Sequence, residues 1–142
     1  MSERVLLIDD EEDFLETLAE RMRNRGMEVS TCNSSIDALK KVEEGSFDAI
    51  VLDLMMPGMD GIQALRAMKE TKPELQVILL TGHATVQKGV EAMKLGASEF
   101  LEKPADVDVL AEKIKKAQAR RMILVEKKAE ERIKRIMSDK PW

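Results

Sequence analysis

Residues 49–61 have the sequence AIVLDLMMPGMDG, and the organisation of the whole chain can be worked out from this stretch. Its four leading apolar residues, 49–52, predict a short strand that is buried on both faces. Pro57 and Gly58 follow closely and end the regular structure. Asp53 is therefore expected at the carboxyl end of a central strand, which is the edge where ligands bind in open α/β sheets.

Four more segments have the composition of strands, and segments of helical spacing separate them. Strands are expected at residues 5–8, 27–32, 77–80 and 99–101, in addition to 49–52. Helices are expected between them, at residues 14–22, 34–45, 61–71, 86–96 and from 106 onward. Strands that alternate with helices in this way form a parallel sheet with helices on both faces.

The composition is typical of a globular domain. The chain has 142 residues, a length sufficient for one domain with its own core. Of these residues, 44% are hydrophobic and 35% are charged. Cys32 is the only cysteine, so an internal disulfide is excluded and a reducing cytoplasm is expected. The N-terminal residues do not resemble a signal peptide, and no apolar run is long enough to cross a bilayer. We therefore expect a cytoplasmic protein with no membrane contact.

Polar residues with reactive groups stand at the ends of four predicted strands. They are Asp9-Asp10, Asp53, Thr81 and Lys103. Because the strands are parallel, we expect these residues at one edge of the sheet. Two carboxylates about 4 Å apart repel each other by roughly 4 kcal/mol at an effective dielectric constant near 20, which favours binding of a cation. Oxygen ligands without His or Cys favour a hard divalent ion such as Mg²⁺.

The same residues can support phosphoryl transfer. An accessible carboxylate such as Asp53 can attack phosphorus and form an aspartyl phosphate. The metal would shield the incoming phosphoryl group from the acidic cluster. Lys103 and the Thr81 hydroxyl could then bind phosphoryl oxygens, so the chemistry requires no general base.

With these residues in this order, the sequence resembles the response-regulator receiver domain of two-component signalling, from Val5 to about Ala117. The resemblance implies a flavodoxin-like, doubly wound (βα)5 fold with a five-stranded parallel sheet. It also implies that Asp53 takes a phosphoryl group from a histidine kinase or phosphotransfer protein. Beyond gaining and losing its own phosphoryl group, such a domain is not expected to be an enzyme.

The resemblance assigns roles around the metal. Asp10 and Asp53 would ligate Mg²⁺ directly, and Asp9 would act mostly through water. The backbone carbonyl of Met55 would supply a further ligand. Because this ligand is a backbone group, a methionine side chain at the position is compatible with it.

The resemblance also assigns a conformational switch. Thr81 matches the switch hydroxyl and Phe100 the switch aromatic residue, which turns inward as Thr81 moves toward the phosphoryl group. Lys103-Pro104 matches the lysine that is followed by a cis-proline bond. Because Phe100 has no phenolic hydroxyl, we expect its two orientations to be less cleanly separated. The single histidine, His83, has no sequence partner, so a tuning role in phosphoryl lifetime is favoured over a catalytic one.

Three alternatives remain open at this point. Haloacid-dehalogenase phosphatases also use an aspartate nucleophile, but they need a second Asp two positions after the first, where this chain has Met55. A receiver-like scaffold that is never phosphorylated is a second alternative. The stretch from Thr81 to Pro104 is similar to receivers of enhancer-binding transcription activators, yet the chain contains no P-loop pattern. It is therefore either a stand-alone receiver or a fragment of a longer regulator.

The C-terminal part departs from the family pattern. We expect a receiver domain at residues 1–119 and a helical extension at 120–142 that continues the last helix to about Met137. Residues 105–142 contain 11 Lys and Arg against 7 Asp and Glu, so direct nucleic-acid binding is not expected. Self-association, including a homodimer through the last helix, or docking to a partner protein is favoured over a solvated helix. The reason is an apolar stripe made of Met122, Val125, Ala129, Ile133 and Ile136.

Overall fold

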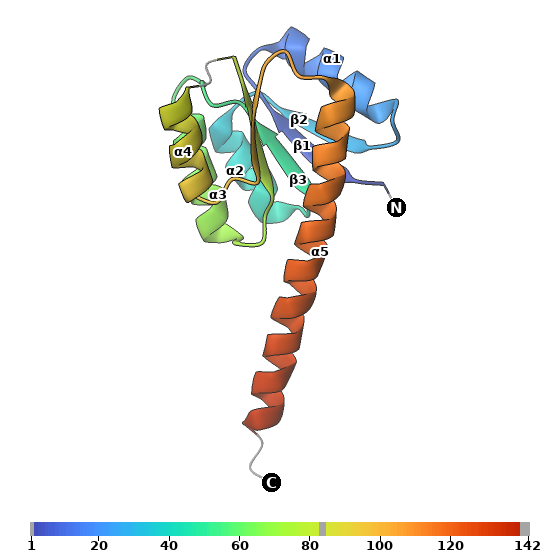
Figure 1. The fold of residues 1–142 in the computed structure, drawn as a ribbon, viewed down its shortest axis with the longest axis vertical. Coiled ribbons are helices and arrows are strands. Elements are labelled where there is room, and N and C mark those ends of the chain that lie inside the picture. The colour runs from blue at the N-terminus through green and yellow to red at the C-terminus, as the bar shows by residue number, and fades with distance from the viewer. Residues whose placement is uncertain (1, 83–84, 140–142) are drawn as a thin grey trace.

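The computed structural model describes residues 2–82 and 85–139. One parallel sheet has the strand order β2-β1-β3-β4-β5 (Figure 1). The strands are β1 (Arg4–Ile8), β2 (Glu28–Cys32), β3 (Ala49–Leu52), β4 (Val77–Thr81) and β5 (Glu99–Glu102). The helices are α1 (Glu12–Arg23), α2 (Ser35–Glu44), α3 (Gly61–Thr71), α4 (Val86–Lys94) and α5 (Val107–Ser138). The predicted flavodoxin-like (βα)5 fold with an extended last helix is therefore confirmed.

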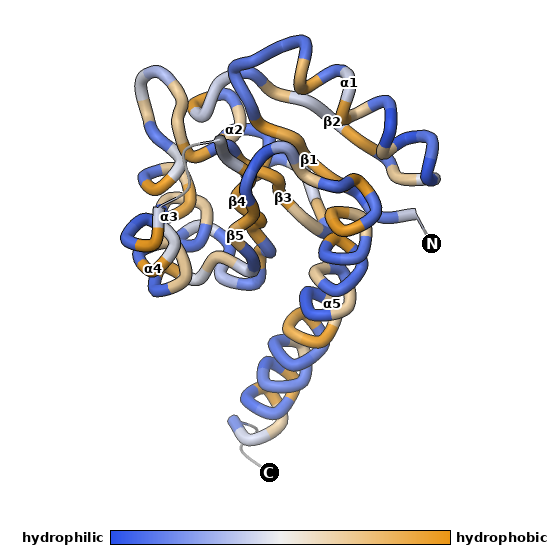
Figure 2. The backbone as a smooth tube through the Cα atoms, turned by 45° about the horizontal axis from the view of Figure 1, so that its top comes forward, coloured by the Kyte–Doolittle hydropathy of each residue, from blue (hydrophilic) through white to orange (hydrophobic). Residues whose placement is uncertain are grey.

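The sheet is buried on both faces because its strands are apolar at consecutive positions. Leu6 and Ile8 belong to one core cluster, which also includes residues of α2, α3 and α4. Val5 and Leu7 belong to a second cluster with residues of α1 and α5. Figure 2 shows the resulting hydrophobic strands between the two helical layers. Continuous apolar strands are what a sheet covered on both sides requires.

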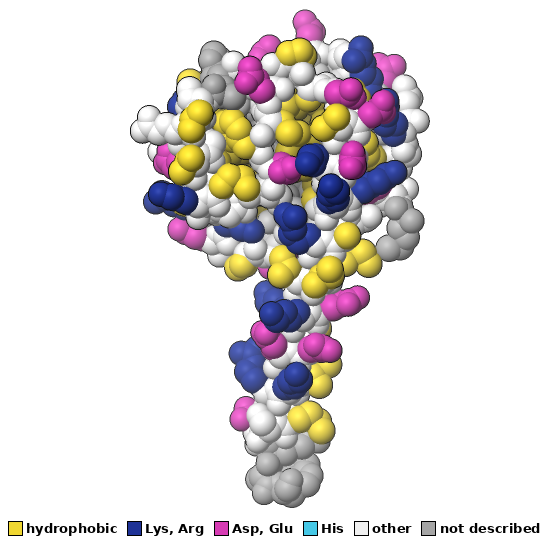
Figure 3. Space-filling view, viewed as in Figure 1, with side chains coloured by type: hydrophobic (Ala, Val, Ile, Leu, Met, Phe, Trp, Pro, Cys, Tyr) yellow, Lys and Arg dark blue, Asp and Glu magenta, His cyan; other side chains and the backbone are white. Residues whose placement is uncertain are grey.

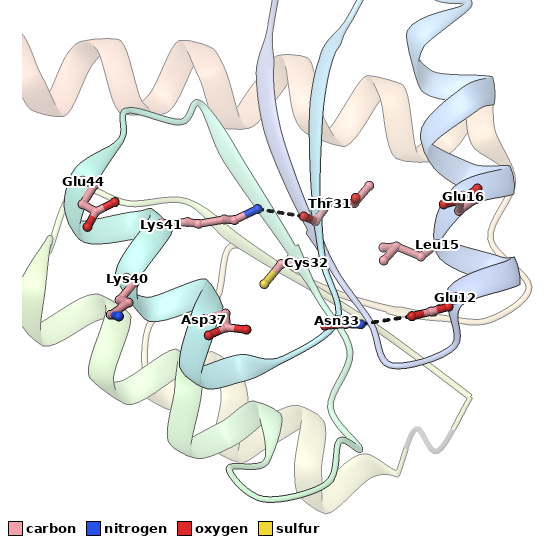
Figure 4. A pocket seen from close by; sticks show the side chains of 10 residues that line it. All are labelled: Glu12, Leu15, Glu16, Thr31, Cys32, Asn33, Asp37, Lys40, Lys41 and Glu44. Atoms are coloured by element: carbon pink, nitrogen blue, oxygen red, sulfur yellow. Dashed lines mark hydrogen bonds between the residues drawn. The ribbon is translucent and has the colours of Figure 1, made fainter.

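One of the two edges of the sheet is formed by β2. On this edge, Lys41 Nζ lies 3.0 Å from the carbonyl oxygen of Thr31, to which it donates a hydrogen bond (Figure 4). A guanidinium nitrogen of Arg23 donates to the carbonyl oxygen of Val29 at 2.7 Å. These side chains reach the edge from α1 and α2 and occupy carbonyl groups of β2, which hinders pairing with another strand. Cys32 is buried at the end of this strand.

A tight loop after β3 fixes the position of Asp53 relative to α3. Asp60 caps α3, because its carboxylate accepts from the Gln63 backbone N–H and the Gln63 side chain accepts from the Asp60 N–H. The Gly61 N–H donates to the Leu54 carbonyl at 2.7 Å. A Cβ atom on Gly61 would lie 2.5 Å from Leu54 Cα and 2.6 Å from the Asp53 carbonyl oxygen. Only glycine fits this approach of helix to loop.

The helix α5 packs against the sheet along its first half, and beyond Arg121 the exposed Lys128 forms an ion pair with Glu74 at 3.8 Å. Leu110, Ile114 and Ala117 are buried against the sheet, whereas residues 122–139 are exposed. The last strong contacts are made at the amino end of β3, where the Asp48 carboxylate accepts from Gln118 Nε2 at 3.2 Å and from Arg121 at 3.4 Å. Beyond that point the helix projects away from the domain (Figure 1). Among the described residues, no helix is both long and apolar enough to span a bilayer.

We predict that Gly61→Ala lowers the free energy of unfolding by about 2 kcal/mol, because the added methyl group meets backbone atoms that cannot move aside cheaply. Urea unfolding followed by circular dichroism measures this change. Gly82→Ala is the matched control, since a Cβ there meets no atom within 4 Å. Equal stability of the two variants would contradict the close approach.

Candidate metal and phosphoacceptor site

Three carboxylates meet at the carboxyl edge of the sheet. Asp9 and Asp10 follow β1, and Asp53 follows β3, which pairs with β1. The Asp53 N–H donates to the Ile8 carbonyl at 3.0 Å, which holds the two strand ends side by side. One carboxylate oxygen from each of the three residues lies within 4.8 Å of the others. Asp9 and Asp53 are buried and Asp10 is exposed, so the cluster opens to solvent on one side.

Lys103 enters this cluster from the loop after β5. Its Nζ atom lies 2.7 Å from Asp9 Oδ2 and 3.5 Å from Asp53 Oδ2, with only 13% of its side chain exposed. The Lys103 backbone N–H donates to the Thr81 carbonyl at 2.8 Å, which ties the lysine loop to the end of β4. The sequence prediction that Asp9, Asp10, Asp53 and Lys103 lie together is thus met by the geometry.

Two further residues contact Lys103 that the sequence did not single out. Nζ lies 4.2 Å from the centroid of the Phe14 ring, on α1, and 3.4 Å from Glu11 Oε1. A cation over an aromatic ring is attracted by the negative charge of the ring face. Phe14 follows the apolar spacing of α1, so nothing in that spacing distinguishes it from a core residue.

Burial and the neighbouring charges together set the pKa values of Asp9 and Lys103. Burial raises the pKa of Asp9 above 3.8, and the nearby charge of Asp53 raises it further. The hydrogen bonds from Lys103 and from the Glu11 N–H oppose these effects without cancelling them. Burial lowers the pKa of Lys103, but the hydrogen bond and charge of Asp9, with the charges of Asp53 and Glu11, raise it above 10.5. The lysine is therefore a permanent cation at neutral pH.

The donor set fits a hard divalent cation. All three side chains that converge are carboxylates, and the only ammonium group that the described structure places among them is that of Lys103. Mg²⁺ and Ca²⁺ bind to oxygen ligands of this kind. The Met55 N–H donates to Asp53 Oδ1 at 3.3 Å, so the backbone at this position adjoins the cluster.

The two expected switch residues lie on neighbouring strands. Thr81 ends β4 and is fully buried. Phe100, on β5, pairs with Leu79 and is half-buried, so that it packs against the core cluster under α4. A Cβ atom on Gly89 of α4 would lie 3.6 Å from its ring. The Lys103–Pro104 bond is cis. His83 lies outside the described residues.

Residues 5–115 match the sequence profile of the response regulator receiver domain. The transcriptional regulatory protein ZraR of Escherichia coli O157:H7 is 36% identical over 120 residues, which are 84% of this chain and 27% of that protein. The chain spans about a quarter of the length of the curated relatives it matches.

Solved structures agree with this match. The beryllofluoride-activated NtrC4 receiver domain dimer is 40% identical, with a TM-score of 0.78 over 83% of this chain and 98% of that one. A response regulator of Burkholderia pseudomallei, determined with a phosphorylated aspartic acid, a calcium ion and citrate, is 29% identical. Its TM-score is 0.76 over 92% of this chain and 75% of that one.

The fold and the acidic edge of the sheet define a CheY-like receiver, and the sequence match agrees. The chain belongs to the response regulator receiver domain family. The predicted resemblance, including that to receivers of enhancer-binding regulators, is confirmed.

We predict that Mg²⁺ raises the free energy of unfolding by about 1–3 kcal/mol when its concentration is well above its Kd, because only the folded chain holds the three carboxylates together. Thermal unfolding with Mg²⁺ or with EDTA measures this gain. Asp10→Asn should remove most of it, whereas Asp13→Asn, an exposed acid on α1, should retain it. An equal gain in both variants would place the ion elsewhere.

We also predict a pH-dependent effect of Asp9→Asn. Because the pKa of Asp9 is raised in the folded chain, the folded chain binds this proton more tightly than the unfolded chain. Stability is then lost as the pH rises from the unfolded pKa, 3.8, through the folded pKa. Asparagine has no such proton, so the stability of the variant relative to wild type should increase over this window. Urea unfolding in EDTA measures it, and a constant difference would argue against the raised pKa.

Proposed function

We propose that this chain is a phosphoacceptor and that Asp53 receives a phosphoryl group from a histidine kinase or phosphotransfer protein. The observation that carries the proposal is the position of the Asp53 carboxylate. It is buried beside Asp9, in reach of the Lys103 ammonium group at 3.5 Å. In the Burkholderia pseudomallei relative, an aspartic acid is phosphorylated.

The reaction is an in-line transfer between two nucleophiles. A carboxylate oxygen of Asp53 bonds to phosphorus while the bond from phosphorus to the donor's histidine nitrogen breaks. That nitrogen keeps the electron pair and takes a proton from water. Lys103 would bind a phosphoryl oxygen, and the Thr81 hydroxyl would donate to another. We propose no reaction on a separate substrate, so the chain would not act as an enzyme on other molecules.

We assign Mg²⁺ as the cofactor. It would be held by Asp10 and Asp53, with Asp9 and the Met55 carbonyl completing the protein ligands, and would offset the repulsion between the acidic cluster and the incoming phosphoryl group. The convergence of three carboxylates on one ammonium group supports this assignment, because it leaves an excess of negative charge at the site.

The response would spread from Thr81 to the surface formed by α4, β5 and α5. Thr81 would move toward the phosphoryl group, and Phe100 would follow it inward. The groove beside Phe100 is lined by apolar side chains of α4, among them Val90 and Met93, which are about half exposed. Loss of contact between Phe100 and Gly89 would reshape this groove.

The long helix α5 belongs to the same surface, and we assign the output to it. Residues 1–119 would form the receiver and residues 120–142 the output segment, through contact with another copy or a partner protein. Lys140 to Trp142 lie outside the described residues. The names of the relatives favour a cytoplasmic role in transcriptional control. In this role the receiver would regulate an output function and would not itself contact DNA.

To test the proposed function, we would incubate the chain with phosphoramidate and Mg²⁺ and measure intact mass. Wild type should gain one phosphoryl group, and Asp53→Asn should gain none, because the attacking oxygen is absent. Asp13→Asn is the control for loss of an acidic group and should behave as wild type. If wild type gains nothing, the chain is a receiver-like scaffold that is not phosphorylated.

Beryllofluoride, which mimics the acyl phosphate, then tests the output. With Mg²⁺, it should change the sedimenting mass of wild type but not of Asp53→Asn or of a chain ending at Ala119. A phosphorylated chain whose mass never changes would retain the phosphoacceptor role and lose the self-association role.

A further inference from the structure

The ammonium group of Lys103 has four contacts in the described structure, and three of them are with carboxylates. Nζ lies 2.7 Å from Asp9 Oδ2, 3.4 Å from Glu11 Oε1 and 3.5 Å from Asp53 Oδ2. The fourth contact is with the ring of Phe14, whose centroid lies 4.2 Å from Nζ. Phe14 is thus the one uncharged group among these four.

The ring and the lysine are held by elements that are far apart in sequence. Phe14 lies in the first turn of α1 and packs against the core cluster that this helix covers. Lys103 follows β5, and its backbone N–H donates to the Thr81 carbonyl at 2.8 Å. Only 13% of the lysine side chain is exposed. The ring therefore covers one side of an ammonium group whose backbone is already fixed.

The carboxylates cannot hold Lys103 equally well throughout the proposed reaction. Asp9 and Asp53 would be shared with Mg²⁺, and one oxygen of Asp53 would become part of the acyl phosphate. The side chain of Glu11 is 67% exposed, so water and salt screen its attraction for the lysine. Of the four contacts, only that with Phe14 attracts the ammonium group to the same extent before and after the transfer.

An aromatic ring also has an advantage over a further acidic group at this place. Several acidic side chains are visible around α1 at the top of Figure 3. Another carboxylate at position 14 would add to the charge that repels the incoming phosphoryl group. The ring attracts a cation through its quadrupole and has no net charge. This attraction depends on the position of the cation over the ring and not on the direction of one N–H bond.

We propose that Phe14 is a positioning residue for Lys103 in phosphoryl transfer to Asp53. It holds the ammonium group beside Asp9 and Asp53, and Nζ turns from Asp9 toward a phosphoryl oxygen without leaving the ring. The ring has no group that makes or breaks a bond, so its effect passes through Lys103. The inference rests on the proposed function, because it concerns the rate of that reaction.

A small cavity beside the ring guides the choice of variant. The cavity has a volume of about 10 Å³ and is lined by Phe14, Asp9 and Asp53, together with apolar residues of the sheet and α1. A much smaller side chain at position 14 would enlarge this cavity next to two carboxylates and admit water. Leucine removes the ring and keeps an apolar side chain, so Phe14→Leu is the variant of choice.

The first test measures the rate at which the full chain gains a phosphoryl group from phosphoramidate with Mg²⁺, by intact mass over time. Phe14→Leu should be slower than wild type by roughly three- to tenfold, because the attraction between ring and cation is lost. Phe47→Leu is the matched control. It removes a buried ring that contacts Arg4 at the opposite edge of the sheet, and its rate should equal that of wild type. Equal rates for Phe14→Leu and wild type, or equal slowing of both variants, would overturn the proposal.

The second test changes the electron density of the ring and keeps its shape. Phenylalanine with one, two or three ring fluorines replaces Phe14 in the otherwise unchanged chain. Each fluorine withdraws electrons from the ring face and weakens its attraction for a cation, so the logarithm of the rate should fall with each one added. The same series at Phe47 should leave the rate unchanged. A rate at position 14 that is independent of fluorine would show that only packing matters there, which overturns the proposal.

The third test reads the contact without phosphorylation. Protons over the face of an aromatic ring resonate upfield, so the ammonium signal of Lys103, assigned with Lys103→Arg, should be shifted upfield in EDTA. Phe14→Leu should remove that shift. A Lys103 signal that is the same in both chains would overturn the proposed contact.

The outcomes separate the positioning role from the proposed function. If wild type gains no phosphoryl group, the proposed function fails and the positioning role fails with it. If wild type is phosphorylated at a rate that does not depend on ring fluorines, the proposed function stands and only the positioning role of Phe14 fails.

Discussion

The excess of negative charge at one edge of the sheet is the constraint on which the rest of this structure depends. Parallel strands bring their carboxyl ends to the same edge of the sheet. Asp9 and Asp53 therefore lie close together once β1 and β3 have paired. Lys103 compensates for only part of that charge, and burial of Asp9 keeps the pKa of this carboxyl group raised. A cation or a phosphoryl group that binds at this edge therefore changes the net charge of the site.

The same constraint explains why the site is linked to distant surfaces. The loop that brings Lys103 to the carboxylates is tied to the end of β4 by the hydrogen bond from the Lys103 N–H to the Thr81 carbonyl. Thr81 and Phe100 lie on strands that pair with each other, and the ring of Phe100 lies under α4 at Gly89. Only Lys103, Thr81 and Phe100 thus connect the carboxylates to the surface of α4 in this series of contacts.

The sequence was sufficient to predict the fold and the meeting of the acids, because both follow from the order and parallel pairing of apolar segments. It did not predict the ring of Phe14 over Lys103 or the contacts of Asp48 with Gln118 and Arg121. These depend on how far side chains reach between elements far apart in sequence, which spacing does not encode. The need for glycine at position 61 is similar, since it arises from a loop folding back onto α3. The roles assigned to the site residues remain predictions.

The unbroken course of α5 has a mechanical consequence. The helix contains no Gly or Pro between Val107 and Ser138, so the part that packs on the sheet and the part beyond it move as one rod. The free arm is about 25 Å long, and a tilt of about 5° at its base displaces its tip by about 2 Å. The ion pair between Asp48 and Arg121, at 3.4 Å, lies at the base of this arm. A small tilt of α5 at the surface of the domain is therefore magnified along the arm, in proportion to the length of the arm.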